Sequence, residues 1–295
     1  MEVRGLPAYR PEPPAGDAPM IALAERYNVP PAGLDGWTVA VNLTRSGCRI
    51  GDPGLRCYAE RLAARSVLAR AAGLVGPLRG ATQVVREPLR EPFAGELDVE
   101  ATLENVLGKP YPEPGDWVVR RREERRHQVV LMVDTSLSMS GENMAVAAVA
   151  AAVLALKLKP EDLAVVVFED KAQAVTRLEV ADPAEEVVRR MLDQPVRGYT
   201  NIAAALELGA AELERGRNPR RSGLLITDGV VTAGADPLPL AHRFPHLHVL
   251  LTEDYKMNPE LCRRLADAGH GDVFPVRAFR DLPARLLDVA NRVLR

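Results

Sequence analysis

The residues of this chain best suited to chemistry are Asp134, Ser136 and Ser138, which come directly after the apolar segment 128–133. A strand that ends in a carboxylate, followed by two hydroxyls at alternate positions, directs three oxygen groups into one tight loop. Oxygen groups of this kind hold hard cations, and Mg²⁺ suits them best. The spacing therefore predicts a magnesium site, with Mn²⁺ or Ca²⁺ as replacements in vitro.

Two later segments can contribute oxygens to the same site. Thr200 stands in Gly198-Tyr-Thr-Asn, just before a helical pattern, and Asp228 follows the apolar run 223–226. Ligands of open α/β sheets collect beyond the carboxyl ends of the strands, where the strand order reverses. If the strands before Asp134 and Asp228 are neighbours, these side chains meet at one edge of the sheet.

The order and types of these residues resemble the von Willebrand factor A (VWA) domain with its metal-ion-dependent adhesion site (MIDAS). The resemblance implies one Mg²⁺ surrounded by five residues: Asp134, Ser136, Ser138, Thr200 and Asp228. It further implies that the hydroxyls touch the metal directly, whereas the two carboxylates act mainly through bound water. Leu137 stands where the commonest version of the motif has glycine, at a position that supplies no ligand.

The chemistry of such a site favours adhesion over catalysis. Mg²⁺ requires an octahedral shell of oxygens and loses water reluctantly. A shell made mostly of neutral hydroxyls leaves the ion with uncompensated positive charge, which attracts a carboxylate from outside. We therefore expect a partner protein to complete the shell with an Asp or a Glu.

From about His127 onward, strand-like and helix-like segments alternate, which is typical of an α/β fold with a mostly parallel sheet. The predicted strands are 128–133, 163–168, 174–178, 223–226, 247–251 and 273–276. The predicted helices are 142–158, 183–192, 202–215, 238–243, 259–268 and 282–294. Only residues 169–173 separate the second and third strands, so these should pair as an antiparallel hairpin at the sheet edge.

The predicted fold class is thus a doubly wound α/β fold, with a six-stranded sheet flanked by helices and a partly helical N-terminal extension. We predict three regions: an extension over 1–95, irregular in part and with a helix near 56–74; a helix and linker over 96–126; and a VWA domain over 127–295.

The clearest element before the VWA domain is the helix predicted after Asp98. Val99, Leu103, Val106 and Leu107 share one face of it, Asp98 can cap its start and Gly108 can end it. This helix, with the basic stretch that follows, resembles bacterial VWA proteins of the CoxE-like and MoxR-associated groups. The resemblance extends toward the VWA part of magnesium-chelatase D subunits and covers about residues 95–295.

Composition excludes several other classes. A net charge of −2 and a pI near 6.3 give no basic surface for nucleic acid. No stretch reaches the ~18 apolar residues of a membrane span, and the N-terminus lacks the layout of a secretory signal, so we expect a cytoplasmic protein. Cys48, Cys57 and Cys262 form an odd set without a C-x-x-C motif, which indicates free thiols. The predominance of arginine over lysine suggests a bacterial source.

Motifs for catalysis are missing from the sequence. It contains no G-x-x-x-x-G-K-[ST] phosphate-binding loop and no G-x-S-x-G nucleophile elbow. Asp134 is followed by Thr135 and Ser136, whereas a Mg²⁺-dependent phosphatase needs a cluster of carboxylates.

We therefore expect a non-enzymatic adaptor that uses Mg²⁺ to bind an acidic side chain of a partner. By resemblance, that partner is a MoxR-type AAA+ ATPase, and the pair acts in chaperone-like or cofactor- and metal-insertion maturation of a client. One alternative is an accessory subunit of a metal chelatase-like complex. Another, from a different class, is a Mg²⁺-dependent hydrolase.

Overall fold

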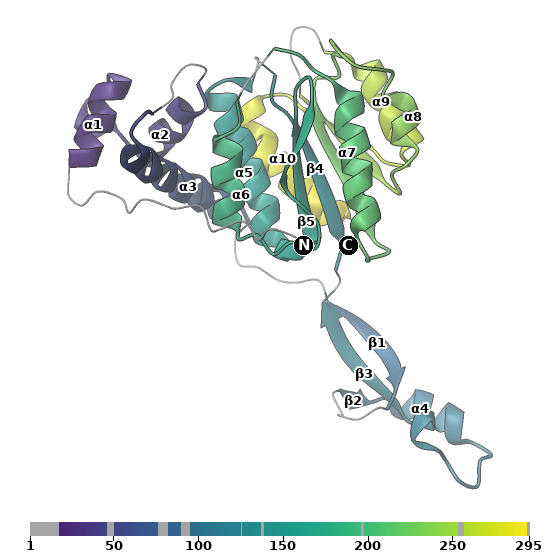
Figure 1. The fold of residues 1–295 in the computed structure, drawn as a ribbon. Coiled ribbons are helices and arrows are strands. Elements are labelled where there is room, and N and C mark those ends of the chain that lie inside the picture. The colour runs from purple at the N-terminus through teal and green to yellow at the C-terminus, as the bar shows by residue number, and fades with distance from the viewer. Residues whose placement is uncertain are drawn as a thin grey trace, which may run out of the picture. The chain divides into compact units, whose positions relative to one another are not determined.

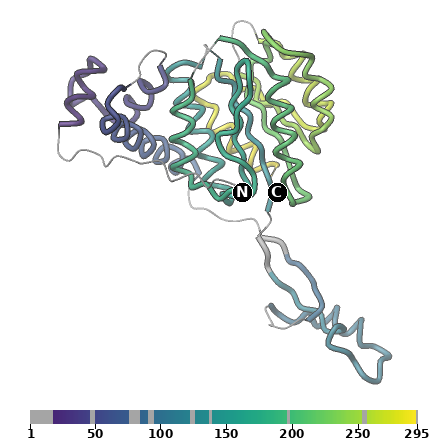
Figure 2. Tube along the Cα trace, in the orientation of Figure 1, coloured from purple at the N-terminus to yellow at the C-terminus, as the bar shows by residue number. Residues whose placement is uncertain are grey.

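The computed structural model describes residues 18–45, 50–75, 82–89, 95–124, 126–136, 139–195, 198–252 and 257–293. They form two compact units, which can be followed along the trace in Figure 2. The larger unit combines the N-terminal segment, up to Gly76, with the segment from His127 to Val293. The smaller unit contains the segment from Pro77 to Arg126. The larger unit thus includes the N-terminal helices together with the sheet domain.

A six-stranded sheet forms the centre of the larger unit. Its strands are β4 (Gln128–Asp134), β5 (Leu163–Phe168), β6 (Ala172–Thr176), β7 (Arg221–Thr227), β8 (Leu247–Thr252) and β9 (Val273–Val276). Their order across the sheet is β6-β5-β4-β7-β8-β9. Only β6 runs antiparallel to its neighbour, which confirms the predicted sheet with one antiparallel edge strand.

The edge strand begins two residues earlier than we predicted. Phe168 pairs with Ala172, and the N–H of Glu169 donates to the carbonyl of Lys171 over 3.1 Å. Because this turn is so tight, β6 covers residues 172–176 where we expected 174–178.

Helices cover both faces of the sheet (Figure 1). On one face lie α5 (Glu142–Lys157), α6 (Ala184–Leu192) and α10 (Leu282–Val293), and on the other lie α7 (Ile202–Arg215), α8 (Leu238–Ala241) and α9 (Pro259–Ala268). Short 3₁₀ helices occur at Pro31–Gly33, Pro114–Asp116, Pro160–Asp162 and Phe279–Asp281.

The N-terminal region adds three helices to the first of these faces. They are α1 (Ala18–Tyr27), α2 (Gly36–Leu43) and α3 (Pro53–Val75). Helix α3 packs against α5 and α6, so α5 lies between the sheet and a further helical layer (Figure 1). This position explains why every residue of α5 from Met144 to Leu154 is buried.

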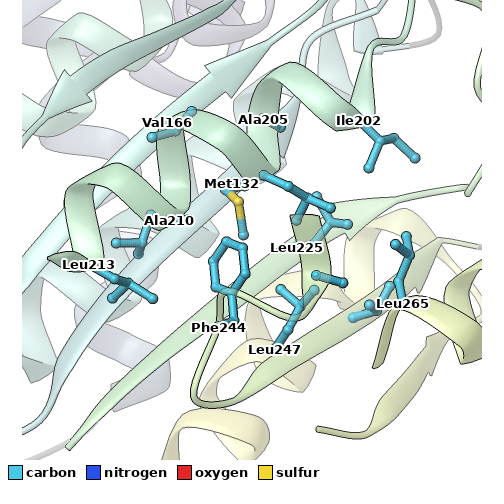
Figure 3. Packing of buried hydrophobic residues seen from close by; sticks show 14 of the residues in the cluster. Met132, Val166, Ile202, Ala205, Ala210, Leu213, Leu225, Phe244, Leu247 and Leu265 are labelled. Carbon is cyan, nitrogen blue, oxygen red and sulfur yellow. The ribbon is translucent and has the colours of Figure 1, made fainter. Parts of the chain in front are cut away.

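The core on the other face gathers around β4 and α7. Figure 3 shows Met132 of β4 against the ring of Phe244, with Leu225 and Leu247 beside them. These four side chains are at most 2% exposed. Close packing under α7 fixes how its N-terminal end lies relative to the ends of β4 and β7.

The smaller unit is a three-stranded antiparallel sheet with one helix. Its elements are β1 (Thr82–Pro88), β2 (Glu96–Leu97), α4 (Val99–Val106) and β3 (Val118–Glu124), with the strand order β1-β3-β2. Helix α4 places a polar residue inside: Thr102 is 5% exposed, and its hydroxyl accepts a 3.0 Å hydrogen bond from the N–H of Val118. Asp98 caps the helix and forms an ion pair with Arg86 at 2.7 Å.

The apolar stripe of α4 faces outward. Val99, Leu103 and Leu107 are 57%, 51% and 77% exposed. Helical spacing correctly indicated that these side chains share a face, but in the part of the chain that the structure describes this face is not covered.

No helix in the described ranges combines the length and the apolar character that crossing a membrane requires. Cys57 and Cys262 are free thiols, and Cys48 lies outside the described residues.

In α4, we predict that replacing a polar residue destabilises the smaller unit more than replacing an apolar one. Thr102→Val should weaken the smaller unit by about 1–3 kcal/mol, because it leaves the partly buried N–H of Val118 without its acceptor. Leu103→Ser, which removes a larger apolar side chain, should cost about 0.5 kcal/mol or less, because that side chain is exposed. Hydrogen exchange of the β3 amides measures both effects. Greater loss of protection in the Leu103 variant would contradict the packing described for α4.

Candidate metal centre

Asp134 and Asp228 lie at the carboxyl ends of neighbouring parallel strands. Asp134 is the last residue of β4, and Asp228 follows the last residue of β7. The two strands pair in register from Gln128↔Arg221 to Val133↔Ile226. The chain moves from β4 to β5 on one side and places β7 on the other, so the two carboxylates stand where the strand order reverses.

The loop after β4 is held to the sheet by its own polar groups. The N–H and the hydroxyl of Thr135 both donate to the carbonyl of Phe168 on β5, over 2.8 and 3.0 Å. The N–H of Ser136 donates to Oδ1 of Asp134 over 2.8 Å. Asp134 is 5% exposed and Ser136 is 9% exposed. Ser138, the third predicted residue of this loop, lies outside the described residues.

The loop after β7 holds Asp228 in a similar way. The N–H of Val230 donates to Oδ1 of Asp228 over 2.8 Å, and the carbonyl of Asp228 accepts from the N–H of Asn258 over 2.8 Å. Gly229 has a φ of 79°, and a Cβ there would lie 2.6 Å from the Asn258 carbonyl oxygen. Only glycine allows this close approach to the start of α9.

Thr200 reaches the site from the start of α7 and is 6% exposed. Its N–H donates to the hydroxyl of Thr232 over 2.8 Å, and its carbonyl accepts from the N–H of Thr232 over 3.1 Å. Asn201 caps α7 by accepting from the N–H of Ala204. The backbone N–H of Asn201 also donates to the carbonyl of Glu169, over 2.7 Å. Thr200 is thus tied both to the loop after β7 and to the β5–β6 turn.

Sequence reasoning missed the two residues that hold Thr200 in place. Asn201 carried a recognisable signal, since asparagine before a helical pattern favours a helix cap. Thr232 carried none, because the path of the loop after β7 brings it to Thr200.

The electrostatics show that four of the five predicted side chains meet. The pKa of Asp134 is raised from 3.8 to about 7, mainly by burial, and the nearby charge of Asp228 contributes to this rise. Hydrogen bonds from the backbone and hydroxyl of Ser136 and from the hydroxyl of Thr200 oppose this rise in pKa. Asp134, Ser136, Thr200 and Asp228 therefore form one cluster of oxygen groups.

This cluster fits a hard divalent cation. A buried carboxylate beside a second carboxylate is costly without a compensating charge, and a cation between them would supply that charge. The surrounding hydroxyls can approach such an ion without adding negative charge. Among the described residues no group of three or more His, Cys, Asp or Glu side chains could hold a metal, so an ion at this edge of the sheet would depend on hydroxyl oxygens as well as on carboxylates.

Burial also affects the nearest thiol. Cys262 of α9 is fully buried, and burial raises its pKa to about 12, with a smaller contribution from the charge of Asp228. The thiol is therefore neutral at physiological pH and acts as a small apolar side chain beside Gly229.

Comparison with solved structures finds several similar chains. The chain is similar to a von Willebrand factor type A protein from Catenulispora acidiphila, with 18% identity over 60% of this chain and 45% of that one, at a TM-score of 0.48. It is similar to proximal thread matrix protein 1 from the mussel byssus, described with a zinc-occupied MIDAS motif, with 20% identity over 57% and 48% of the two chains and a TM-score of 0.48. It is also similar to BatB from Bacteroides thetaiotaomicron, with 16% identity over 57% and 98% and a TM-score of 0.44.

The chain spans less than half the length of the first two of these proteins. No curated protein matches it. A family model does match, over residues 68–260, and its description is a VWA domain containing CoxE-like protein. This match covers more than half of the sequence and includes the four clustered residues. The chain therefore belongs to the family of CoxE-like proteins that contain a VWA domain.

Proposed function

We propose that this protein is a non-enzymatic adaptor that binds Mg²⁺ at the candidate metal centre and uses the ion to hold an acidic side chain of a partner protein. The observation that carries the proposal is the meeting of Asp134, Ser136, Thr200 and Asp228 at the switch point of the sheet. Ser138, which follows in the same loop, is proposed as a further ligand.

The donor set supports adhesion because it would leave positive charge on the ion. Two carboxylates held by hydrogen bonds from N–H groups are already partly neutralised, and the remaining donors are uncharged hydroxyls. A Mg²⁺ in this setting retains coordination positions that water or an outside carboxylate can fill.

The surroundings of the site also suit a protein partner. Tyr199, directly before Thr200, is 61% exposed. Tyrosine is among the residues enriched at the centres of protein interfaces. An acidic side chain that reaches the metal would bring its neighbours against this ring.

We further propose that the partner is a MoxR-type AAA+ ATPase and that the pair matures a client protein by a chaperone-like or cofactor-insertion activity. This step is supported by the resemblance to MoxR-associated VWA proteins and by the match to the family model of CoxE-like proteins with a VWA domain. The ATPase would supply the energy, because this chain has no phosphate-binding loop of its own.

Metal binding should stabilise the wild-type chain. At a Mg²⁺ concentration of about 100 times the dissociation constant, we expect the free energy of unfolding to rise by about 2.7 kcal/mol. Asp134→Asn and Thr200→Val should lose most of this increase, whereas Asp170→Asn, which changes an exposed turn residue, should keep it. Thermal unfolding with Mg²⁺ and with EDTA measures the effect. Equal stabilisation of all the variants would place the ion elsewhere.

Without metal, stability should depend on pH through Asp134. Its pKa is raised in the folded state from 3.8 to about 7, so its favourable contribution is present below pH ~4 and is lost as the pH rises through ~7. In EDTA at pH 8, Asp134→Asn should therefore be more stable than wild type, by about 1–3 kcal/mol. At pH 4 the difference should be small. Parallel stability curves of the two proteins across this range would be inconsistent with a buried, desolvated carboxyl.

Affinity purification from the native cell extract tests the partner. With Mg²⁺ present, we expect mass spectrometry to identify a MoxR-type AAA+ ATPase that is absent with EDTA and absent with Asp134→Ala. Tyr199→Ala should retain Mg²⁺ but recover less ATPase, because it removes an exposed contact without touching the cluster. A set of partners that is indifferent to both EDTA and Asp134→Ala would mean that binding does not use the metal.

A further inference from the structure

The end of helix α2 contacts the loop that joins β4 to α5, which we call the metal loop. The loop leaves β4 at Asp134 and enters α5 after Gly141. The hydroxyl of Thr44, at the end of α2, donates to the carbonyl of Gly141 over 2.8 Å, and the N–H of Gly141 donates to the carbonyl of Thr44 over 3.3 Å. The two residues are 97 positions apart and form a closed pair of hydrogen bonds.

The bond to Gly141 is the best one that the Thr44 hydroxyl can form. The same oxygen lies 3.2 Å from the carbonyl of Ala40 and 3.1 Å from that of Val41, both in its own helix. A hydroxyl has a single proton to donate, and the shortest of the three distances leads to Gly141. Thr44 is 3% exposed, so water does not readily replace this bond.

Helix α2 is a firm support for this contact. Gly36 lies so close to α3 that a Cβ there would come within 2.6 Å of the carbonyl oxygen of Leu62. Val39 and Ala40 are fully buried, and Asp35 caps the helix by accepting from the N–H of Thr38 over 2.8 Å. Helix α3 in turn packs along α5 (Figure 1).

The contact between Thr44 and Gly141 affects both the metal loop and the first turn of α5. The carbonyl of Gly141 also accepts from the N–H of Ala145, which forms the first turn of α5. Within the loop, the N–H of Met139 donates to the carbonyl of Ser136 over 2.9 Å. Thr135 fixes the beginning of the loop on β5, and Thr44 fixes its end. Along the sequence, Ser136 and Ser138 come between the two attachments, and Asp134 directly precedes the first.

We infer that Thr44 is a positioning residue for the metal centre: its hydroxyl bond to Gly141 holds the loop in the form that binds Mg²⁺. The inference rests on the proposed function. It assigns to the N-terminal helices a role in metal affinity, although α2 lies outside the residues 68–260 that the family model matches. Residues that orient the ligands of a metal commonly change its affinity by about 10–100-fold when they are replaced.

The test compares three variants of the full chain by two measurements, the Mg²⁺ dissociation constant from calorimetry and the urea unfolding of the metal-free protein in EDTA. Thr44→Val removes the hydroxyl and keeps the shape, and Thr44→Ser keeps the hydroxyl. Thr176→Val is the matched control. Thr176 is 2% exposed and donates to Asp182 over 2.7 Å, but it pairs with Val165, toward the opposite end of β5 from the metal loop.

We expect Thr44→Val to weaken Mg²⁺ binding by about tenfold or more, and Thr44→Ser to stay within about twofold of wild type. Thr176→Val should lose stability in EDTA without losing Mg²⁺ affinity. If Thr44→Val does not fold, Thr44→Ala replaces it in the same comparison.

The outcomes separate the two proposals. Wild-type affinity in a folded Thr44→Val, or an equal loss of affinity in Thr44→Val and Thr176→Val, would overturn the role of Thr44 while leaving the metal centre in place. Absence of Mg²⁺ binding by the wild-type protein would instead overturn the proposed function, and the role of Thr44 with it.

Discussion

The burial of the Asp134 carboxylate beside Asp228 is the constraint on which the rest of this structure depends. The pKa of Asp134 is raised to about 7, mainly by burial, and the charge of the second carboxylate contributes to this rise. A fold keeps such an arrangement only if hydrogen bonds or a cation compensate for it. Here hydrogen bonds from Ser136 and Thr200 compensate in part, and the remaining demand for positive charge is what a divalent ion would meet.

The layers of the fold keep this arrangement rigid. Helix α7 packs on β4 through the core around Met132 and Phe244 and so sets the position of Thr200. On the other face, α5 packs between the sheet and α3. Because the metal loop ends where α5 begins, this packing holds the end of the loop in place. The N-terminal helices therefore belong to the same compact unit as the metal centre, and they contribute to it through Thr44.

The sequence predicted the central strands of the sheet well because they are buried on both faces and read as continuous apolar runs. We could predict that Asp134 and Asp228 lie close together because each follows such an apolar run and because the sequence resembles the VWA domain. Contacts between loops were not predictable. Neither the bond from Thr200 to Thr232 nor the one from Thr44 to Gly141 leaves a pattern along the chain, because each depends on the paths of two separate segments. Helix α4 shows a second limit: spacing groups Val99 with Leu103, but it does not say whether anything covers them.

The most direct measurement is a crystal structure of the full chain grown with Mn²⁺, with anomalous data to locate the ion. We expect one strong anomalous peak at the edge of the sheet, within coordination distance of the hydroxyls of Ser136 and Thr200 and between the carboxylates of Asp134 and Asp228. Ser138 should complete the hydroxyl ligands from the same loop. Manganese bound only at other positions, with these side chains bonded to one another and to water, would contradict the account.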